Sequence, residues 1–332
     1  MQIVYVLVAN NSNLYLEELW ISIFSVRLIH SDINIKVLVD VDTEKLVTSR
    51  PKLIALISEL IVVPTPGGYN AKQRSRHIKT SIREIIKGPF LFIDTDTVVC
   101  KSLMSVDDVL NDINLDENPI LAVPDGHLPL KECLFPPTRE VKRIFNVDCS
   151  DAEYWFNSGV MYVADTPLAH KFYKKWNENW RYSCFEKGNS QDQPALLKTN
   201  KDFEYIIREL PGIYNVQVAL SLKYYADAVI LHWWHMDFIS NQSYSPYFSL
   251  QIYEELRKLG YITEEIKEKI VNVKQSFTSP TMPIGSEQIL FLFSPVGKIF
   301  NKIFIEGGVA SWLMLKFAKY LEKLHNFTYR KK

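Results

Sequence analysis

Short apolar runs and longer amphipathic segments alternate along roughly the first two thirds of the chain. Short runs of this kind are typical of buried strands, whereas apolar residues at helical spacing are typical of helices. The predicted strands are Ile3–Val8, Ile35–Val39, Leu60–Val63, Phe90–Ile93, Ile120–Val123, Val160–Val163 and a strand that leads into His232. The predicted helices are Leu14–Leu28, Pro51–Ser58, Asn70–Ile86, Pro167–Trp180 and Gln193–Leu197. This alternation predicts an α/β fold with a mainly parallel sheet covered by helices.

The pattern changes after about residue 240, so we predict one domain over 1–240 and a helical C-terminal extension over 241–332. Leu250–Lys269 is a charged helical stretch, and Ser276–Ser286 has the Pro, Ser and Thr content of a linker. From Ile289 onward, apolar and aromatic groups are separated by lysines. Such a segment either lies on a membrane surface or packs on the main domain with its lysines in solvent. No apolar run is long enough to span a bilayer.

The overall charge of the chain argues against nucleic acid as a partner. Its 38 Lys and Arg residues balance 38 Asp and Glu residues, so no net field attracts a polyanion. The four cysteines have no metal-binding spacing, and we expect reduced thiols. The N-terminus has the pattern of a strand and not of a signal peptide, which favours a cytoplasmic location.

Two carboxylates follow the most apolar of the predicted strands. Asp94 and Asp96 come directly after Phe90–Ile93, at the strand end where open α/β sheets bind ligands. Alternate residues of an extended segment point the same way, so both carboxylates can face one cation. Oxygen ligands suit Mg²⁺ or Mn²⁺ held together with substrate phosphates. The alternative is that both acids cap a turn or the next helix.

Three further polar clusters each allow two interpretations. Asn157, Ser158 and Gly159 precede a predicted strand and form either a turn, which is the commoner role, or a set of sugar-binding groups. Asp192 is either a helix cap or, with its flanking glutamines, part of a polar wall that binds hydroxyl groups. His232 is either a core histidine or a further ligand of the metal.

Taken in order, these clusters resemble the motifs of the GT-A glycosyltransferases, particularly the retaining family 8 enzymes typified by glycogenin and bacterial lipooligosaccharide galactosyltransferases. The resemblance covers roughly residues 1–236. Its matching segments are Asp94-Thr-Asp96, Phe156-Asn-Ser-Gly-Val160, Gln191-Asp-Gln193, Leu210-Pro-Gly-Ile-Tyr-Asn215 and Ile230-Leu-His232. It implies a GT-A fold, which is a mixed Rossmann-like sheet flanked by helices. It also implies that a sugar is transferred from a nucleotide-sugar donor, with a UDP-sugar as the first candidate, to a glycan or lipid-linked acceptor.

The resemblance also implies a role for individual residues. Asp94, Asp96 and His232 would bind Mn²⁺ or Mg²⁺, which bridges the donor diphosphate. Asp192 and Gln193 would be the catalytic residues at the sugar, with Gln193 near the anomeric carbon. The donor-binding residues would be Ala9, Asn11, Tyr15, Arg76, Lys79, Thr95, Asn157 and Ser158. Instead of binding the donor, Arg76 and Lys79 could belong to a basic helix face that is exposed to solvent.

The chain departs from the family pattern in three places. The loop Ala9-Asn-Asn-Ser-Asn13 lacks the usual Asp, the segment after His232 lacks the usual Lys, and Pro194 replaces a second Asp. Trp155, Trp233 and Trp234 either stack on acceptor sugars or pack in the core.

Two other functions fit the same residues. Asp94-Thr-Asp-Thr97 also matches the nucleophile motif of haloacid-dehalogenase-type phosphatases, in which Asp94 would be phosphorylated and Asp96 would act as acid and base. No later acidic pair follows at the right distance, which counts against this alternative. A catalytically weak scaffold that binds glycan or membrane is the third hypothesis.

Overall fold

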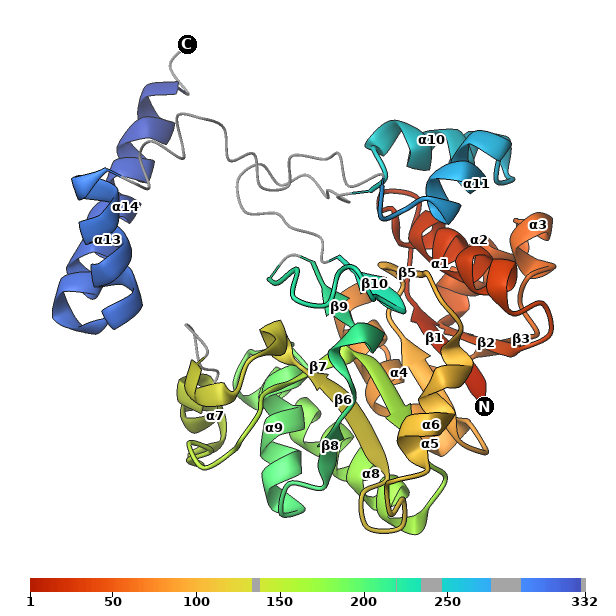
Figure 1. The fold of residues 1–332 in the computed structure, drawn as a ribbon, viewed down its shortest axis with the longest axis horizontal. Coiled ribbons are helices and arrows are strands. Elements are labelled where there is room, and N and C mark those ends of the chain that lie inside the picture. The colour runs from red at the N-terminus through yellow and green to blue at the C-terminus, as the bar shows by residue number, and fades with distance from the viewer. Residues whose placement is uncertain (133–137, 219, 234–246, 276–293, 330–332) are drawn as a thin grey trace. The chain divides into compact units, whose positions relative to one another are not determined.

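The computed structural model describes residues 1–132, 138–218, 220–233, 247–275 and 294–329 (Figure 1). The chain divides into two compact units, residues 1–281 and residues 282–332. The predicted extension over 241–332 therefore includes parts of both units. The predicted linker Ser276–Ser286 lies outside the described residues.

A seven-stranded sheet forms the centre of the first unit, in the order β3-β2-β1-β4-β7-β6-β8 (Figure 1). Its strands are β1 (Gln2–Leu7), β2 (Asn34–Val39), β3 (Glu59–Val62), β4 (Phe90–Ile93), β6 (Ile120–Pro124), β7 (Phe156–Val163) and β8 (Ile207–Glu209). Strands β1 to β4 are parallel to one another, as are β6 and β8, whereas β7 is antiparallel to both its neighbours. The predicted α/β fold with a mainly parallel sheet is confirmed.

Helices cover both faces of this sheet because alternate residues of each strand point to opposite sides. In β1, Ile3 and Tyr5 pack with helix α1, whereas Val4 and Val6 pack with α4, α5 and α8. The helices of the first unit are α1 (Tyr15–Ile29), α2 (Val41–Thr48), α3 (Pro51–Ile54), α4 (Ala71–Thr80), α5 (Ile82–Ile85), α6 (Val106–Leu110), α7 (Thr138–Phe145), α8 (Pro167–Arg181), α9 (Gln193–Asp202), α10 (Leu250–Leu259) and α11 (Glu264–Val271).

Two predicted helices are each divided in the structure. The segment Asn70–Ile86 forms α4 and α5, because Ser81 leaves the helical region with φ −106° and ψ 2°. The segment Leu250–Lys269 forms α10 and α11, because Gly260 adopts the left-handed conformation, with φ +73°, and ends α10. Thr263 then caps α11. The spacing of apolar residues alone does not show where a helix is interrupted in this way.

Strand β7 begins four residues earlier than predicted, so the interpretation of Asn157, Ser158 and Gly159 as a turn is wrong. All three lie within the strand, where β4 and β6 flank it on either side. Pairing on both edges and burial on both faces outweigh the turn propensity of an Asn-Ser-Gly sequence.

A second, three-stranded sheet has the order β5-β10-β9, formed by β5 (Thr97–Val99), β10 (Ile230–His232) and β9 (Val216–Gln217). Asp94, Thr95 and Asp96 lie where the chain leaves β4 in the large sheet and enters β5 in the small one. Strand β10 is antiparallel to β5 and places His232 opposite Thr97. This pairing brings the imidazole beside the two carboxylates.

Helices α10 and α11 pack on α1 and complete the first unit (Figure 1). Arg257 of α10 donates to both carboxylate oxygens of Glu17, at 2.8 Å each. The same guanidinium donates to the carbonyl oxygens of Asn11, at 3.0 Å, and of Asn13. The loop after β1 is therefore attached to α10.

In the second unit, α13 (Pro295–Glu306) and α14 (Gly308–Tyr329) are joined through Gly307. No helix among the described residues is both long enough and apolar enough to cross a membrane. Large apolar side chains are nevertheless exposed on both helices. They are Val296, Ile299, Phe300, Val309, Trp312, Leu313, Leu315, Phe317, Tyr320 and Leu321. Lys316 lies over the Trp312 ring, 3.9 Å from its centroid.

The described cysteines, Cys100, Cys149 and Cys184, are free thiols as predicted, and Cys133 lies outside the described residues. Burial raises the pKa of Cys100 and of Cys149 to about 11, so neither is a reactive thiolate at neutral pH.

Candidate functional site

Three side chains meet at the junction of the two sheets. One carboxylate oxygen of Asp94, one of Asp96 and a ring nitrogen of His232 all lie within 4.8 Å of one another. His232 Nε2 is 3.3 Å from Asp96 Oδ1. Two hard oxygen ligands with one imidazole nitrogen form a donor set that suits Mn²⁺ and also accepts Mg²⁺.

A chain of hydrogen bonds fixes the tautomer of His232. The backbone N–H of Gly159 lies 2.8 Å from the side-chain amide of Asn157. A backbone N–H can only donate, so the amide atom that it contacts must be the oxygen, Oδ1. Asn215 Nδ2 donates to the same oxygen at 2.9 Å, which leaves Asn215 Oδ1 facing His232 Nδ1 at 2.9 Å. Nδ1 must therefore carry a proton, which leaves Nε2, on the side of Asp96, as the ring nitrogen that can bind a metal.

The backbone at Gly159 passes close to this site. A Cβ atom there would lie 2.4 Å from His232 Cε1 and 2.9 Å from both Asp94 Oδ2 and Asn157 Oδ1. The Asp94 N–H also donates to the Gly159 carbonyl at 2.7 Å. A side chain at position 159 is therefore excluded, and the space that Gly159 leaves lies beside the candidate metal ligands.

Two cations and two carboxylates form a charge network beside the site, in which Lys79 and Asp192 are buried. Lys79 Nζ lies 3.1 Å from Asp94 Oδ1 and 3.6 Å from Asp192 Oδ2. Arg76 Nε forms an ion pair with Asp192 Oδ1 at 3.0 Å. The Lys79 side chain is only 3% exposed, whereas that of Arg76 is 26% exposed. A solvated helix face is therefore excluded for Lys79, because an unpaired ammonium buried to this extent would cost several kcal/mol.

Charge and burial act in opposite directions on the groups of this network. Burial raises the pKa of Asp192, but attraction to Arg76 and Lys79 outweighs burial and holds the pKa well below its usual range. Burial also raises the pKa of Asp94, and Lys79 opposes that effect without cancelling it. Burial lowers the pKa of the His232 imidazole, but the negative charge of Asp96 outweighs burial and leaves that pKa raised. A divalent cation would relieve the repulsion between the two site carboxylates.

Gln193, at the first position of α9, has one amide orientation. Its Nε2 lies 3.3 Å from Asp125 Oδ1 and 3.3 Å from the Phe156 carbonyl oxygen. Both partners are acceptors, so the amide nitrogen must face them and Oε1 has no part in either bond. Asp192, the preceding residue, accepts from Ser158 Oγ at 2.8 Å and is 3% exposed.

Asp125 was not among the predicted site residues, yet it joins the predicted ones. Its Oδ1 accepts from Asn157 Nδ2 at 2.9 Å as well as from Gln193. Burial raises its pKa, and these hydrogen bonds oppose that effect. The signal was present in the sequence, since Asp125 follows the strand Ile120–Pro124 as Asp94 follows β4. Asn215, in a segment of the family resemblance, was given no role and is the link to His232.

The residues predicted around the nucleotide occupy the loop after β1 and the start of α1. Ala9 is buried, and its N–H donates to Thr43 Oγ1 at 2.9 Å. Tyr15 is 39% exposed, and its pKa is raised by burial and by the negative charges of Glu18 and Asp96. Tyr15 therefore lies on the Asp96 side of the site, whereas Asn11 is exposed and its carbonyl accepts from Arg257.

Two of the three tryptophans predicted to stack on sugar or to pack in the core lie among the described residues. Trp233 is fully buried and Trp155 is 8% exposed, so the core alternative is confirmed for both. Trp234 lies outside the described residues.

Buried His127, two residues from Asp125, gives a prediction of pH-dependent stability. Its Nε2 accepts from the Gln217 N–H at 3.4 Å, and burial lowers its pKa from 6.5 to about 4. The unfolded chain takes up a proton near pH 6.5 that the folded protein does not. The contribution of His127 to the free energy of unfolding is therefore fully present above pH 6.5 and is lost as the pH falls toward 4.

We expect this group to lower the free energy of unfolding by roughly 2 kcal/mol between pH 7.5 and 4.5. His127→Asn should remove that part of the pH dependence, measured by urea unfolding at both pH values. Asparagine suits the left-handed backbone at this position, where φ is +58°. Equal pH dependence in the two proteins would refute the assignment.

Comparisons with known proteins establish the fold. No family model and no curated protein matches the chain. An active-site mutant of LgtC aligns with a TM-score of 0.51 at 17% identity, over 81% of this chain and 100% of that chain. The bifunctional glycosyltransferase WbbM, in its apo structure, aligns with a TM-score of 0.50 at 17% identity, over 81% of this chain and 51% of that chain. The chain therefore has the GT-A fold that the sequence resemblance implies.

Proposed function

We propose that the protein is a metal-dependent glycosyltransferase of the family 8 type. It would transfer a sugar from a nucleotide-sugar donor, with UDP-sugars as the first candidates, to a glycan or lipid-linked acceptor with retention of configuration. The observation that carries this proposal is the meeting of Asp94, Asp96 and His232 beside a partly buried charge network in a GT-A fold. Fold alone does not specify chemistry, so the proposal rests on the site.

The charged residues divide into two roles. Asp94, Asp96 and His232 would hold Mn²⁺ or Mg²⁺, which supplies positive charge to the departing diphosphate. Arg76 is partly exposed and can extend this positive charge to the diphosphate. Lys79 is buried between Asp94 and Asp192 and would keep both carboxylates in place.

The sugar-binding residues are Asn157, Ser158, Asp192 and Gln193. Because the amide nitrogen of Gln193 faces Asp125, its carbonyl oxygen is available to an electron-poor anomeric carbon. That is the group a retaining transferase needs on the β face of the sugar. The family resemblance implies that an oxygen of the leaving phosphate accepts the proton of the acceptor hydroxyl.

The base and ribose would lie against the loop after β1. Ala9, Asn11 and Tyr15 remain the candidates, with Thr95 between the two site carboxylates. Arg257 holds this loop through the Asn11 carbonyl, so the candidate residues are positioned before a donor binds.

A panel of nucleotide sugars incubated with the full chain tests the proposal. Hydrolysis of at least one donor in Mn²⁺, abolished by chelation, is the expected result. Release of phosphate from p-nitrophenyl phosphate without donor hydrolysis would instead support the phosphatase. Calorimetry that detects neither donor nor Mn²⁺ binding would support the scaffold.

We also propose that the second unit associates with the inner face of a membrane. Its exposed apolar residues accompany four lysines, Lys298, Lys302, Lys316 and Lys319, against one acidic residue between 294 and 321, Glu306. Apolar contact combined with cationic flanks favours anionic bilayers, by about 1 kcal/mol for each lysine. Replacing all four lysines by glutamine should therefore weaken binding to vesicles with 30% anionic lipid at least tenfold in flotation assays.

The control for flotation replaces four exposed lysines of the first unit, namely Lys45, Lys52, Lys131 and Lys142. These changes alter net charge equally and should leave flotation unchanged. Equal loss in both variants, or no flotation of the unaltered chain, would contradict membrane association through the second unit.

A further inference from the structure

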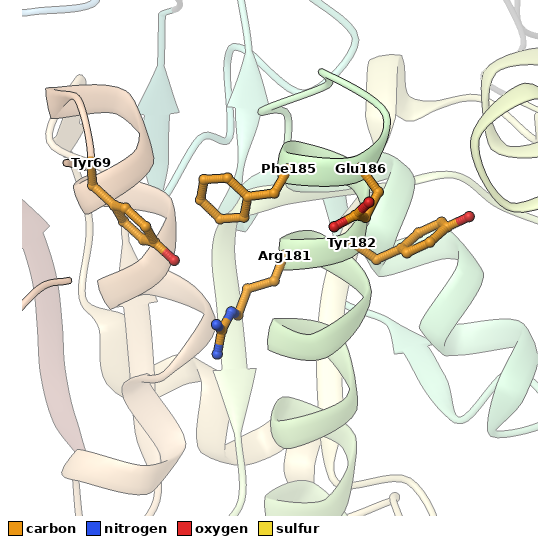
Figure 2. A pocket seen from close by; sticks show the side chains of 5 residues that line it. All are labelled: Tyr69, Arg181, Tyr182, Phe185 and Glu186. Carbon is orange, nitrogen blue, oxygen red and sulfur yellow. The ribbon is translucent and has the colours of Figure 1, made fainter. Parts of the chain in front are cut away.

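An open pocket of about 430 Å³ lies between the loop that precedes α4 and a π-helical turn, Tyr182–Glu186, that follows α8 (Figure 2). This aromatic pocket is lined by Tyr69, Arg181, Tyr182, Phe185 and Glu186. Its volume is in the range of sites that bind small molecules. None of its residues takes part in the network around Asp94 and Asp192.

Two rings of the pocket, those of Tyr69 and Phe185, pack together, whereas the Tyr182 ring points the other way and lies 5.8 Å from the Phe145 ring (Figure 2). Tyr69 and Phe185 face each other in Figure 2, with ring centroids 4.9 Å apart and planes tilted by 34°. Trp180 supports both rings edge-on, at 6.1 Å from Phe185 and 6.4 Å from Tyr69. Phe185 is 44% exposed and Tyr182 42% exposed, although both are large aromatic side chains. An exposed ring surface of this kind suits the apolar C–H face of a pyranose.

The polar groups of the pocket complement hydroxyl groups. Arg181 offers guanidinium donors and Glu186 offers carboxylate acceptors. Across the described part of the chain, no hydrogen bond or ion pair occupies either group. One positive and one negative side chain favour a neutral ligand that both donates and accepts hydrogen bonds over a polyanion.

Both walls of the pocket lead to the proposed transfer site. On one wall, Tyr69 lies two residues before α4 begins, and Arg76 lies within that helix, roughly 7.5 Å along its axis from Ala71. On the other, Trp180 Nε1 donates to the Ser190 carbonyl at 3.2 Å, and Trp176 Nε1 donates to the Asp192 carbonyl at 3.1 Å. The pocket is therefore connected, through Trp180, to the segment that carries Asp192.

We propose that the aromatic pocket is a binding subsite for the acceptor saccharide, an inference that rests on the proposed glycosyltransferase function. A sugar ring some distance from the reacting hydroxyl would lie on Phe185 and Tyr69, with its hydroxyl groups bonded to Arg181 and Glu186. The subsite would then select acceptors longer than one sugar. It would replace the contacts that Trp155 and Trp233, being buried, do not provide.

Saturation-transfer NMR on the full chain tests this subsite, with maltotriose, cellotriose, chitotriose and globotriose as probes. We expect at least one trisaccharide to bind, with affinity at least fivefold weaker in Phe185→Ala and at least twofold weaker in Arg181→Gln. Both side chains are exposed, so folding should survive, and thermal unfolding checks this. Tyr261→Ala is the control, since Tyr261 is 47% exposed in another part of the first unit.

Three outcomes would overturn the subsite. They are the absence of saturation transfer from all four trisaccharides, equal affinity in Phe185→Ala, or a dimer that Phe185→Ala dissociates in light scattering. Nucleotide-sugar hydrolysis by the unaltered chain, measured in parallel, reports separately on the proposed function. Trisaccharide binding without any hydrolysis would contradict the proposed transferase function but would still support a saccharide-binding site at Phe185.

Discussion

Asp96→Asn is expected to reduce metal-dependent hydrolysis of the nucleotide sugar roughly 10³-fold, because a bound ion supplies several kcal/mol of stabilisation to the leaving group. The asparagine keeps the shape of the side chain but removes the charge that faces His232 Nε2 at 3.3 Å. Binding of Mn²⁺, followed by electron paramagnetic resonance, should weaken in parallel. This second measurement reports on the site even before the donor sugar is known.

Asp108→Asn is the matched control for Asp96→Asn. It makes the same chemical change on exposed Asp108 of α6 and should leave Mn²⁺ binding and hydrolysis unchanged. If Asp96→Asn binds Mn²⁺ as tightly as the unaltered chain, then Asp94, Asp96 and His232 do not form a metal site.

Gly159→Ala is expected to have the second-largest effect. The added methyl group would lie 2.4 Å from His232 Cε1 and 2.9 Å from Asp94 Oδ2, so the ligands must move apart. We expect Mn²⁺ affinity and donor hydrolysis to fall at least tenfold, with overpacking lowering stability by about 1–3 kcal/mol. Manganese titration and urea unfolding separate these two effects.

Gly67→Ala provides the control for Gly159→Ala. A Cβ atom at Gly67 meets no heavy atom within 4 Å, so the same substitution should change neither metal binding nor stability. Unchanged Mn²⁺ affinity in Gly159→Ala would show that the site tolerates a displaced histidine, against the tight geometry described above.

The sequence predicted the elements whose signal is local. The apolar run Phe90–Ile93 is strand β4, and two of the three candidate metal ligands, Asp94 and Asp96, come just after it. The third, His232, is 136 residues further along, and only the pairing of β10 with β5 brings it near Asp96. The family resemblance supplied that long-range connection, whereas apolar periodicity did not.

What sequence reasoning missed depends on contacts between distant segments. The start of β7 was placed too late because Asn-Ser-Gly has turn propensity, and no local signal shows that β4 and β6 both pair with it. Lys79 looked like any basic helix residue, although the fold buries it between Asp94 and Asp192. Burial of Trp233 likewise follows from packing against Tyr247 and Phe248, which lie on the far side of a segment outside the described residues.

The attachment of α10 to the loop after β1 sets a limit on how far the protein can be shortened. The Arg257 guanidinium connects Glu17 to the carbonyl groups of Asn11 and Asn13. A recombinant fragment that ends at residue 240 would lose this connection, although it would retain every residue predicted to bind the donor. Work aimed at a minimal catalytic core should therefore keep the chain through Val273, a buried core residue two positions after the end of α11.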